Sequence, residues 1–230
     1  MKSFLLEERR LKPPFDLRLI AVRPDLADAA VKGLFVARRF AEPLPARCVV
    51  PFTPILLTPG SDRTSELLLG ERFNVLDISD GWAWGWCAHD HYVGYIAAAA
   101  LGEASPHEEF PAGDTIEAAL RFLDMPYLLS GRGGAGIDCS GLVQRAFAAV
   151  GVSLPRDSDM QQALGIPLAA DNQLLRGDLI GFAGHVGLMM DADLLIHATA
   201  HWGRTLVEPL ADVTSRTAIT SRARLSDSRS

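Results

Sequence analysis

The residues best able to do chemistry in this chain are one cysteine and two later histidines. Cys139 lies in the run Gly-Ile-Asp-Cys-Ser-Gly at 136–141, and helically spaced apolar residues follow it at Leu142, Val143, Ala146, Phe147 and Val150. Asp138 or Ser140 can cap the first turn of such a helix. We therefore expect Cys139 at a helix N-terminus, where unpaired amides and the helix dipole favour a thiolate over a thiol.

His185 and His197 lie in two strand-like segments joined by a short turn at 191–193. Alternation places His185 on the same face as Gly187, which leaves room beside the ring, while Val186 and Leu188 face the core. His197 then lies on the adjacent strand, where its ring can orient the first imidazole. The set predicts a cysteine hydrolase with Cys139 as nucleophile, His185 as general base and His197 as the orienting residue.

The elements that must position this set divide into two domains with an α+β layout. Residues 1–45 are expected to pack on the first domain, with a short helical pattern near 26–40. Residues 46–102 carry short strands separated by turn residues, which predicts a small β-barrel whose Trp82, Trp84 and Trp86 share one face. A linker at 103–113 leads to the second domain, 114–230, which begins with a helix near 114–123 and ends in antiparallel strands.

Composition excludes several classes of function. A net charge of −6 over 230 residues argues against nucleic acid or an anionic membrane as the main partner. The first ten residues contain no apolar run long enough for a signal peptide or membrane anchor, and three cysteines without framework spacing suit a reducing compartment. We expect a cytoplasmic protein that needs neither a cofactor nor a metal. The oligomeric state is left open.

Six pieces of the second domain, in order, resemble the NlpC/P60 family of papain-like cysteine peptidases, which cleave bacterial cell-wall peptides. They are residues 126–127, 136–141, 154–158, 176–180, 184–188 and 196–198. The barrel resembles the bacterial SH3-like domains that accompany such peptidases, at 69–71, 81–83 and 92–95. One departure is His91, which stands where these SH3 domains usually have glycine.

The resemblance implies an enzyme that cuts the bond between γ-D-glutamate and a diamino acid in murein peptides with a free N-terminal L-alanine. It also implies further site residues. Tyr127 would donate to the oxyanion, Asp138 and Ser140 would line the pocket, and Asp157 and Ser158 would accept from the substrate ammonium group. From the SH3-like domain, Tyr92 and Glu71 would close the amine site. For Asp157 and Ser158, helix capping is an alternative role.

Two other functions stay open at this stage. One is another papain-like amide chemistry, in an amidase or acyltransferase. The other is a wall-binding module whose catalytic domain has lost activity, although the intact set of Cys139, His185 and His197 argues against it. The sequence does not decide between diaminopimelate and lysine at the third substrate position.

Overall fold

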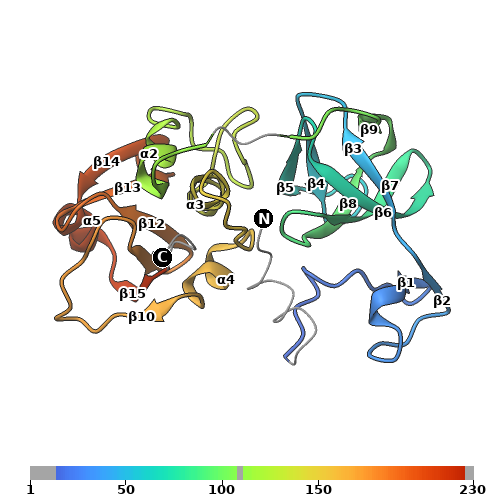
Figure 1. The fold of residues 1–230 in the computed structure, drawn as a ribbon, viewed down its shortest axis with the longest axis horizontal. Coiled ribbons are helices and arrows are strands. Elements are labelled where there is room, and N and C mark those ends of the chain that lie inside the picture. Colours follow the sequence, from blue (N-terminus) through green and yellow to red (C-terminus); the bar gives the residue numbers. More distant parts are fainter. Residues whose placement is uncertain (1–13, 108–110, 226–230) are drawn as a thin grey trace. The chain divides into compact units, whose positions relative to one another are not determined.

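The structure of the chain is a computed structural model, which describes residues 14–107 and 111–225 (Figure 1). These two stretches form two compact units. Residues 1–13 of the expected extension, 108–110 of the expected linker and 226–230 lie outside the described residues. Within the described part, no helix is long and apolar enough to cross a membrane.

The first unit contains the small β-barrel that the sequence predicts. Its strands pair only in antiparallel fashion, in the order β5-β4-β8-β7-β6-β3-β9. Their bounds are β3 (Leu44–Cys48), β4 (Phe52–Leu56), β5 (Arg63–Leu68), β6 (Arg72–Ser79), β7 (Trp82–Cys87), β8 (Val93–Ala97) and β9 (Leu101–Gly102), with a 3₁₀ turn, η2 (Ala98–Ala100), before β9. Strand β4 contains Pro54, which has no backbone amide to donate to a neighbouring strand.

The prediction of a helical segment near residues 26–40 is wrong. The segment forms β1 (Leu26–Asp28), the 3₁₀ turn η1 (Ala29–Val31) and β2 (Arg39–Ala41), and β1 pairs in parallel with β2. The Asp28 carboxylate accepts a hydrogen bond from the Ala30 amide at 2.9 Å, which starts the tight turn. Gly33, at φ 90°, then takes the chain out of any helical path.

The residues before β3 cover one face of β7. Trp84 lies in a buried cluster with Ala21 and Leu26, and the Trp86 indole donates to Asp28 at 2.8 Å. The Arg23 guanidinium stacks over the Trp84 ring at 4.3 Å. The described part of the N-terminal segment therefore packs on the barrel through the face that carries the tryptophans.

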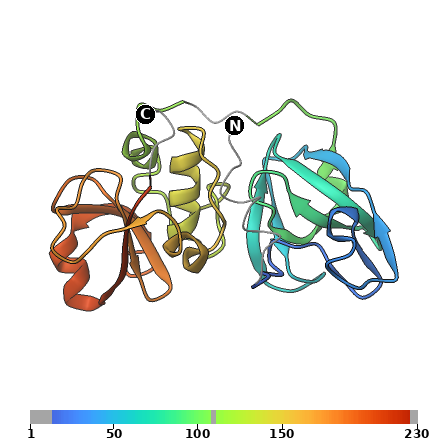
Figure 2. The same cartoon turned by 60° about the horizontal axis from the view of Figure 1, so that its bottom comes forward.

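The second unit is an α+β domain, as predicted (Figure 2). Its helices are α2 (Thr115–Leu120), α3 (Cys139–Ala148), α4 (Ser158–Gln162) and α5 (Leu210–Arg216). Its sheet has the order β10-β15-β11-β12-β13-β14, and every pairing is antiparallel. The strands are β10 (Ile166–Pro167), β11 (Leu179–Phe182), β12 (His185–Met189), β13 (Leu194–Thr199), β14 (Arg204–Pro209) and β15 (Ile219–Arg224).

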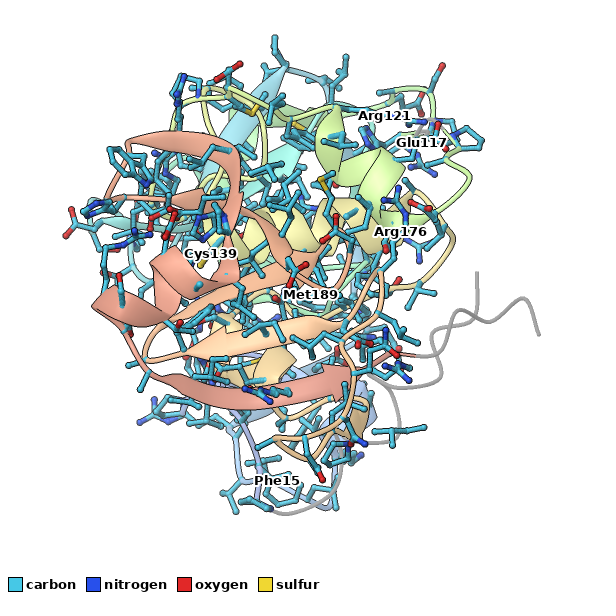
Figure 3. The ribbon with its side chains drawn as sticks, turned by 90° about the vertical axis from the view of Figure 1, so that its left-hand side faces the viewer. Phe15, Glu117, Arg121, Cys139, Arg176 and Met189 are labelled. Carbon is cyan, nitrogen blue, oxygen red and sulfur yellow. The ribbon has the colours of Figure 1, made fainter. Side chains whose placement is uncertain are left out.

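Helix α3 packs against one face of this sheet. Its buried side chains share a core with residues that point toward it from β12 and β13: Leu142, Val143, Ala146, Phe147, Val186, Leu188 and Ile196. Met189 points to the opposite face, into a second cluster that includes Val213 of α5 (Figure 3). Because both faces are covered, the sheet holds the start of β12 rigidly beside the start of α3.

Candidate active site

Cys139 is the first residue of α3, as predicted. The Asp138 side chain caps the helix, because its carboxylate accepts from the Gly141 amide at 2.7 Å. Only 6% of Cys139 is exposed, and Figure 3 labels it at this end of the helix. The Val186 backbone amide donates to the Cys139 sulfur, which puts the thiol against β12, one residue from His185.

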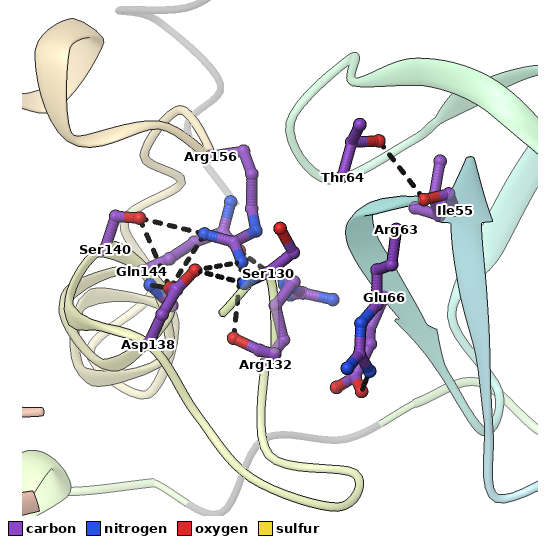
Figure 4. A network of polar contacts seen from close by, with 12 residues as sticks. Ile55, Arg63, Thr64, Glu66, Ser130, Arg132, Asp138, Ser140, Gln144 and Arg156 are labelled. Carbon is purple, nitrogen blue, oxygen red and sulfur yellow. Dashed lines mark hydrogen bonds and ion pairs between the residues drawn. The ribbon is translucent and has the colours of Figure 1, made fainter. Parts of the chain in front are cut away.

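Asp138 and Ser140 belong to a buried network centred on Arg156 (Figure 4). The Arg156 guanidinium holds the Asp138 carboxylate with two hydrogen bonds, of 3.0 and 2.8 Å, and donates to the Ser140 hydroxyl at 2.9 Å. The Ser130 amide adds another bond to Asp138, at 2.8 Å. All these acceptors are engaged within the protein, so Asp138 and Ser140 fix the helix start. Their predicted lining of the substrate pocket stays a prediction.

The two histidines form a hydrogen-bonded line that ends on a carboxylate. His185 Nε2 lies 2.8 Å from His197 Nδ1, and His197 Nε2 lies 2.8 Å from Glu208 Oε1. Glu208 is buried and also accepts from Arg216 at 2.6 Å. His197 and Glu208 reach each other because they are diagonal neighbours on one face of the β13–β14 pair.

Glu208 decides where the protons sit on both rings. Burial pushes the pKa of Glu208 upward, but the bonds from Arg216 and His197 outweigh it and hold the pKa below its usual value. An ionised carboxylate only accepts, so His197 Nε2 carries the proton. The neutral His197 ring then accepts at Nδ1 from His185 Nε2–H. This leaves His185 Nδ1 with a bare lone pair, which is the form a general base needs.

Gly187 leaves room for residues of β13, not for substrate. A Cβ atom there would lie 3.0 Å from the Leu195 side chain and 3.1 Å from the Cβ of His197. The expectation that this glycine leaves space for substrate beside His185 is therefore wrong. The absent side chain makes room for Leu195 and His197 on β13 instead.

Burial opposes the thiolate expected at the helix start. Burial, reinforced by the neighbouring Asp138 carboxylate, raises the pKa of the Cys139 thiol to about 11. Burial and the adjacent His197 lower the pKa of His185 to about 4. The helix dipole does not overcome desolvation and an adjacent negative charge. Both shifts favour a thiol beside a neutral imidazole in the resting pair.

Tyr127 lies beside the nucleophile. It packs against the core cluster that contains Cys139. Burial raises the pKa of its hydroxyl to about 12, helped by the negative charge that Cys139 carries once it is ionised and by the Asp138 carboxylate. The hydroxyl therefore stays protonated and can donate a hydrogen bond, which the predicted oxyanion role requires.

Asp157 and Ser158 lie at the start of α4. Asp157 occupies the N-cap position, but its side chain makes no capping hydrogen bond, so the alternative role of helix capping gains no support for this residue. Gln161 ties the same helix to the site, because its amide donates to the backbone oxygens of Ser140 and Pro155 at 2.9 Å each. Contact of Asp157 and Ser158 with a substrate amine stays a prediction.

Tyr92 and Glu71 belong to the first unit, and both are mostly buried there. Glu71 accepts from the Leu68 amide at 2.8 Å, and the Tyr92 amide donates to Asp90 at 3.0 Å. Their predicted approach to the substrate amine stays a prediction.

Sequence reasoning missed Glu208 and the role of Arg156. Arg156 stands in the 154–158 motif, yet nothing in the motif shows that it pairs with Asp138, 18 positions away. An acidic residue between Val207 and Pro209 is the only sequence signal for Glu208. Only the β13–β14 register shows that this acidic residue lies next to His197.

A cysteine at a helix start, packed on an antiparallel sheet that carries two histidines, defines the papain-like architecture. Residues 124–221 match the NlpC/P60 family, and residues 58–101 match the bacterial dipeptidyl-peptidase SH3 domain. The chain thus carries an NlpC/P60 domain preceded by a bacterial SH3 domain, as the sequence resemblance implied.

Individual relatives cover different shares of the chain. Dipeptidyl-peptidase 6 of Lysinibacillus sphaericus is 34% identical over 86 residues, which cover 37% of this chain and 32% of that protein. Gamma-D-glutamyl-L-lysine dipeptidyl-peptidase of Bacillus subtilis is 37% identical over 95 residues, covering 38% and 32%. The chain thus spans about a third of the length of each. A solved NlpC/P60 family protein from Bacillus cereus is 24% identical, with coverages of 78% and 63% and a TM-score of 0.47.

Removing the Arg156 guanidinium should be costly, because it would leave the Asp138 carboxylate buried without its counter-ion. We expect Arg156→Ala to lower the free energy of unfolding by about 3–5 kcal/mol in a denaturant titration. The matched control is Arg176→Ala, which breaks the half-exposed pair with Asp114 and should cost about 0–1 kcal/mol. Equal losses in the two variants would contradict the role given to Arg156.

Proposed function

We propose that the chain is a cysteine peptidase that hydrolyses the γ-D-glutamyl–diamino acid bond of murein peptides with a free N-terminal L-alanine. The observation that carries this proposal is the hydrogen-bonded line His185–His197–Glu208. The Cys139 thiol at the start of α3 accepts from the Val186 amide, the residue next to His185 in the chain. The name of the Bacillus subtilis relative, gamma-D-glutamyl-L-lysine dipeptidyl-peptidase, supports the choice of bond. The name of the Lysinibacillus sphaericus relative, dipeptidyl-peptidase 6, supports the release of a dipeptide.

The residues have the following roles in the proposed reaction. His185 Nδ1 takes the thiol proton as the Cys139 sulfur attacks the γ-carbonyl carbon, so no free thiolate needs to accumulate. The oxyanion accepts from the Cys139 backbone amide at the helix start and from the Tyr127 hydroxyl. His185 then gives its proton to the leaving amine, and a thioester forms. Water, deprotonated by His185, cleaves the thioester, releases L-Ala-D-Glu and restores the thiol.

Glu208 and Arg216 act through the histidines in this scheme. They fix both tautomers, so the base is ready before substrate arrives, and neither residue touches the reacting atoms. The recycling of wall-derived peptides and the cytoplasmic location stay predictions that follow from the sequence alone.

The full chain should convert L-Ala-γ-D-Glu-diaminopimelate into L-Ala-D-Glu and free diaminopimelate, identified by mass spectrometry. Cys139→Ala should abolish turnover while its circular dichroism spectrum is retained, because it removes the nucleophile and only a small side-chain volume. Retained turnover in this variant would end the cysteine-peptidase proposal. No turnover by the folded wild-type chain would favour a wall-binding module instead.

The same assay tests the free amine. An N-acetylated substrate should be cut roughly 10- to 200-fold less efficiently, since a charge-assisted hydrogen bond contributes about 1.5–3 kcal/mol. Equal rates for the two peptides would leave a peptidase without the proposed specificity. Cleavage of unrelated amides at a similar rate would favour a general amidase or acyltransferase.

Glu208→Gln should lower kcat and leave KM nearly unchanged, because it weakens the control of tautomers without touching substrate. The loss should be smaller than that of His185→Ala, which removes a contribution of roughly 10²–10⁴-fold. The matched control is Glu117→Gln, an exposed glutamate on α2, which should leave kcat unchanged. An unchanged kcat in Glu208→Gln would remove Glu208 from the mechanism.

The acid limb of the pH profile should lie unusually low. His185 must be neutral to act as base, and its pKa is lowered to about 4. As pH falls, kcat/KM should therefore hold through the range near 6.5, where an ordinary histidine would already be protonated. Initial rates between about pH 4 and 8, with the fold followed by circular dichroism, check this. A midpoint near 6.5 would contradict a buried neutral base, and His201→Gln, an exposed histidine, should not move the limb.

A further inference from the structure

The turn that joins β7 to β8 brings together a thiol, an imidazole and a carboxylate that the proposed reaction does not use. Cys87 ends β7, and the chain reverses over the next five residues, with the His91 amide donating to the Cys87 oxygen at 2.8 Å. His91 takes a left-handed conformation, at φ 61°. The tight reversal places one ligand atom each from Cys87, His89 and Asp90 within 4.8 Å of one another.

His89 is the unexplained member of this group. Both of its ring nitrogens are buried, and neither has a hydrogen-bond partner among the described residues. Leaving a buried polar atom unsatisfied costs about 1–3 kcal/mol. Buried polar atoms without a partner are rare in folded proteins, so two on one ring call for an explanation.

The distance between His89 and Asp90 indicates what that partner is. His89 Nε2 lies 3.3 Å from Asp90 Oδ2, yet the two atoms do not form a hydrogen bond. Two ligands of a tetrahedral ion, each about 2.0–2.1 Å from the metal, lie roughly 3.3 Å apart. The pair therefore has the spacing of two neighbouring ligands that share a cation.

The other side of the His89 ring fits the same interpretation. Its Nδ1 faces Glu71 Oε2 at 4.0 Å. Metal-binding histidines commonly turn their second nitrogen toward a carboxylate, which fixes the ring and strengthens the ligand. Glu71 is itself held by the Leu68 amide at 2.8 Å.

We propose that Cys87, His89 and Asp90 bind a thiophilic divalent cation, and that Zn²⁺ is the best match. A thiolate, an imidazole and a carboxylate form a ligand set that zinc accepts, whereas calcium and magnesium prefer oxygen alone. Binding converts the Cys87 thiol to a thiolate and releases its proton to solvent. The fourth position is left for water. The ion would tie the end of β7 to the turn and so stabilise the barrel.

The proposal is tested by metal binding rather than by peptidase activity, so it can fail independently of the proposed function. The protein is the full chain carrying Cys139→Ala, which removes the thiol beside the other two histidines. After treatment with a chelator, it is titrated with Co²⁺, whose thiolate complexes absorb in the near ultraviolet, and then with Zn²⁺. We expect one Co²⁺ per chain, displaced by Zn²⁺, and a higher Tm with Zn²⁺ than without it.

Variants locate the site. Cys87→Ser and His89→Gln should each weaken Co²⁺ binding by roughly 10-fold or more. Cys48→Ala, which removes another buried thiol of the same barrel, should leave binding unchanged. His89 lies on the turn with 19% of its side chain exposed, so His89→Gln decides the question if Cys87→Ser does not fold. Absence of the thiolate band at excess Co²⁺, or full binding by folded His89→Gln, would overturn the proposal.

Discussion

Two buried carboxylates, one at each end of the set formed by Cys139, His185 and His197, are each paired with an arginine. Asp138 caps the helix that presents the thiol and is paired with Arg156. Glu208 ends the histidine line and is paired with Arg216. Burying a carboxylate without a counter-ion is costly, because the charge loses its hydration. The position of the thiol and the direction of the hydrogen bonds between the rings therefore both depend on guanidinium groups outside the reacting set.

In this arrangement, the features that position the Cys139 sulfur are not the features that help it to lose its proton. The helix start gives Cys139 its position and a backbone amide for the oxyanion, but the same burial and the neighbouring Asp138 keep the sulfur protonated. The two histidines can activate the thiol instead. Glu208 fixes the tautomers of both rings, so that His185 Nδ1 is unprotonated and can accept the thiol proton. With these shifts, the sulfur loses its proton to His185 as it attacks the carbonyl carbon, rather than beforehand.

The sequence was sufficient for the parts of the fold that local pattern controls. Apolar spacing and Asp138 predicted α3, and alternation predicted β12 and β13. It failed near residues 26–40, where apolar residues spaced as on a helix instead fill two clusters on either side of a short parallel strand pair. It also missed that Arg156 pairs with Asp138 and that Glu208 pairs with His197. These partners lie on different segments, and no single segment of sequence shows how two segments are placed against each other. The sequence also gave no sign of what opposes a thiolate at Cys139, because the helix dipole can be inferred from sequence, whereas desolvation cannot.

The tryptophan face of β7 bears on how this protein can be divided. Trp84 and Trp86 are covered by Ala21, Leu26 and Asp28. The segment before residue 46 therefore covers the barrel on that side, although it lies outside the barrel predicted from the sequence. An excised fragment starting at residue 46 would present an indole surface to water and would be prone to self-association. The unit that recombination can move between proteins is thus longer than the barrel itself. A fusion junction should therefore lie before the residues that cover Trp84 and Trp86.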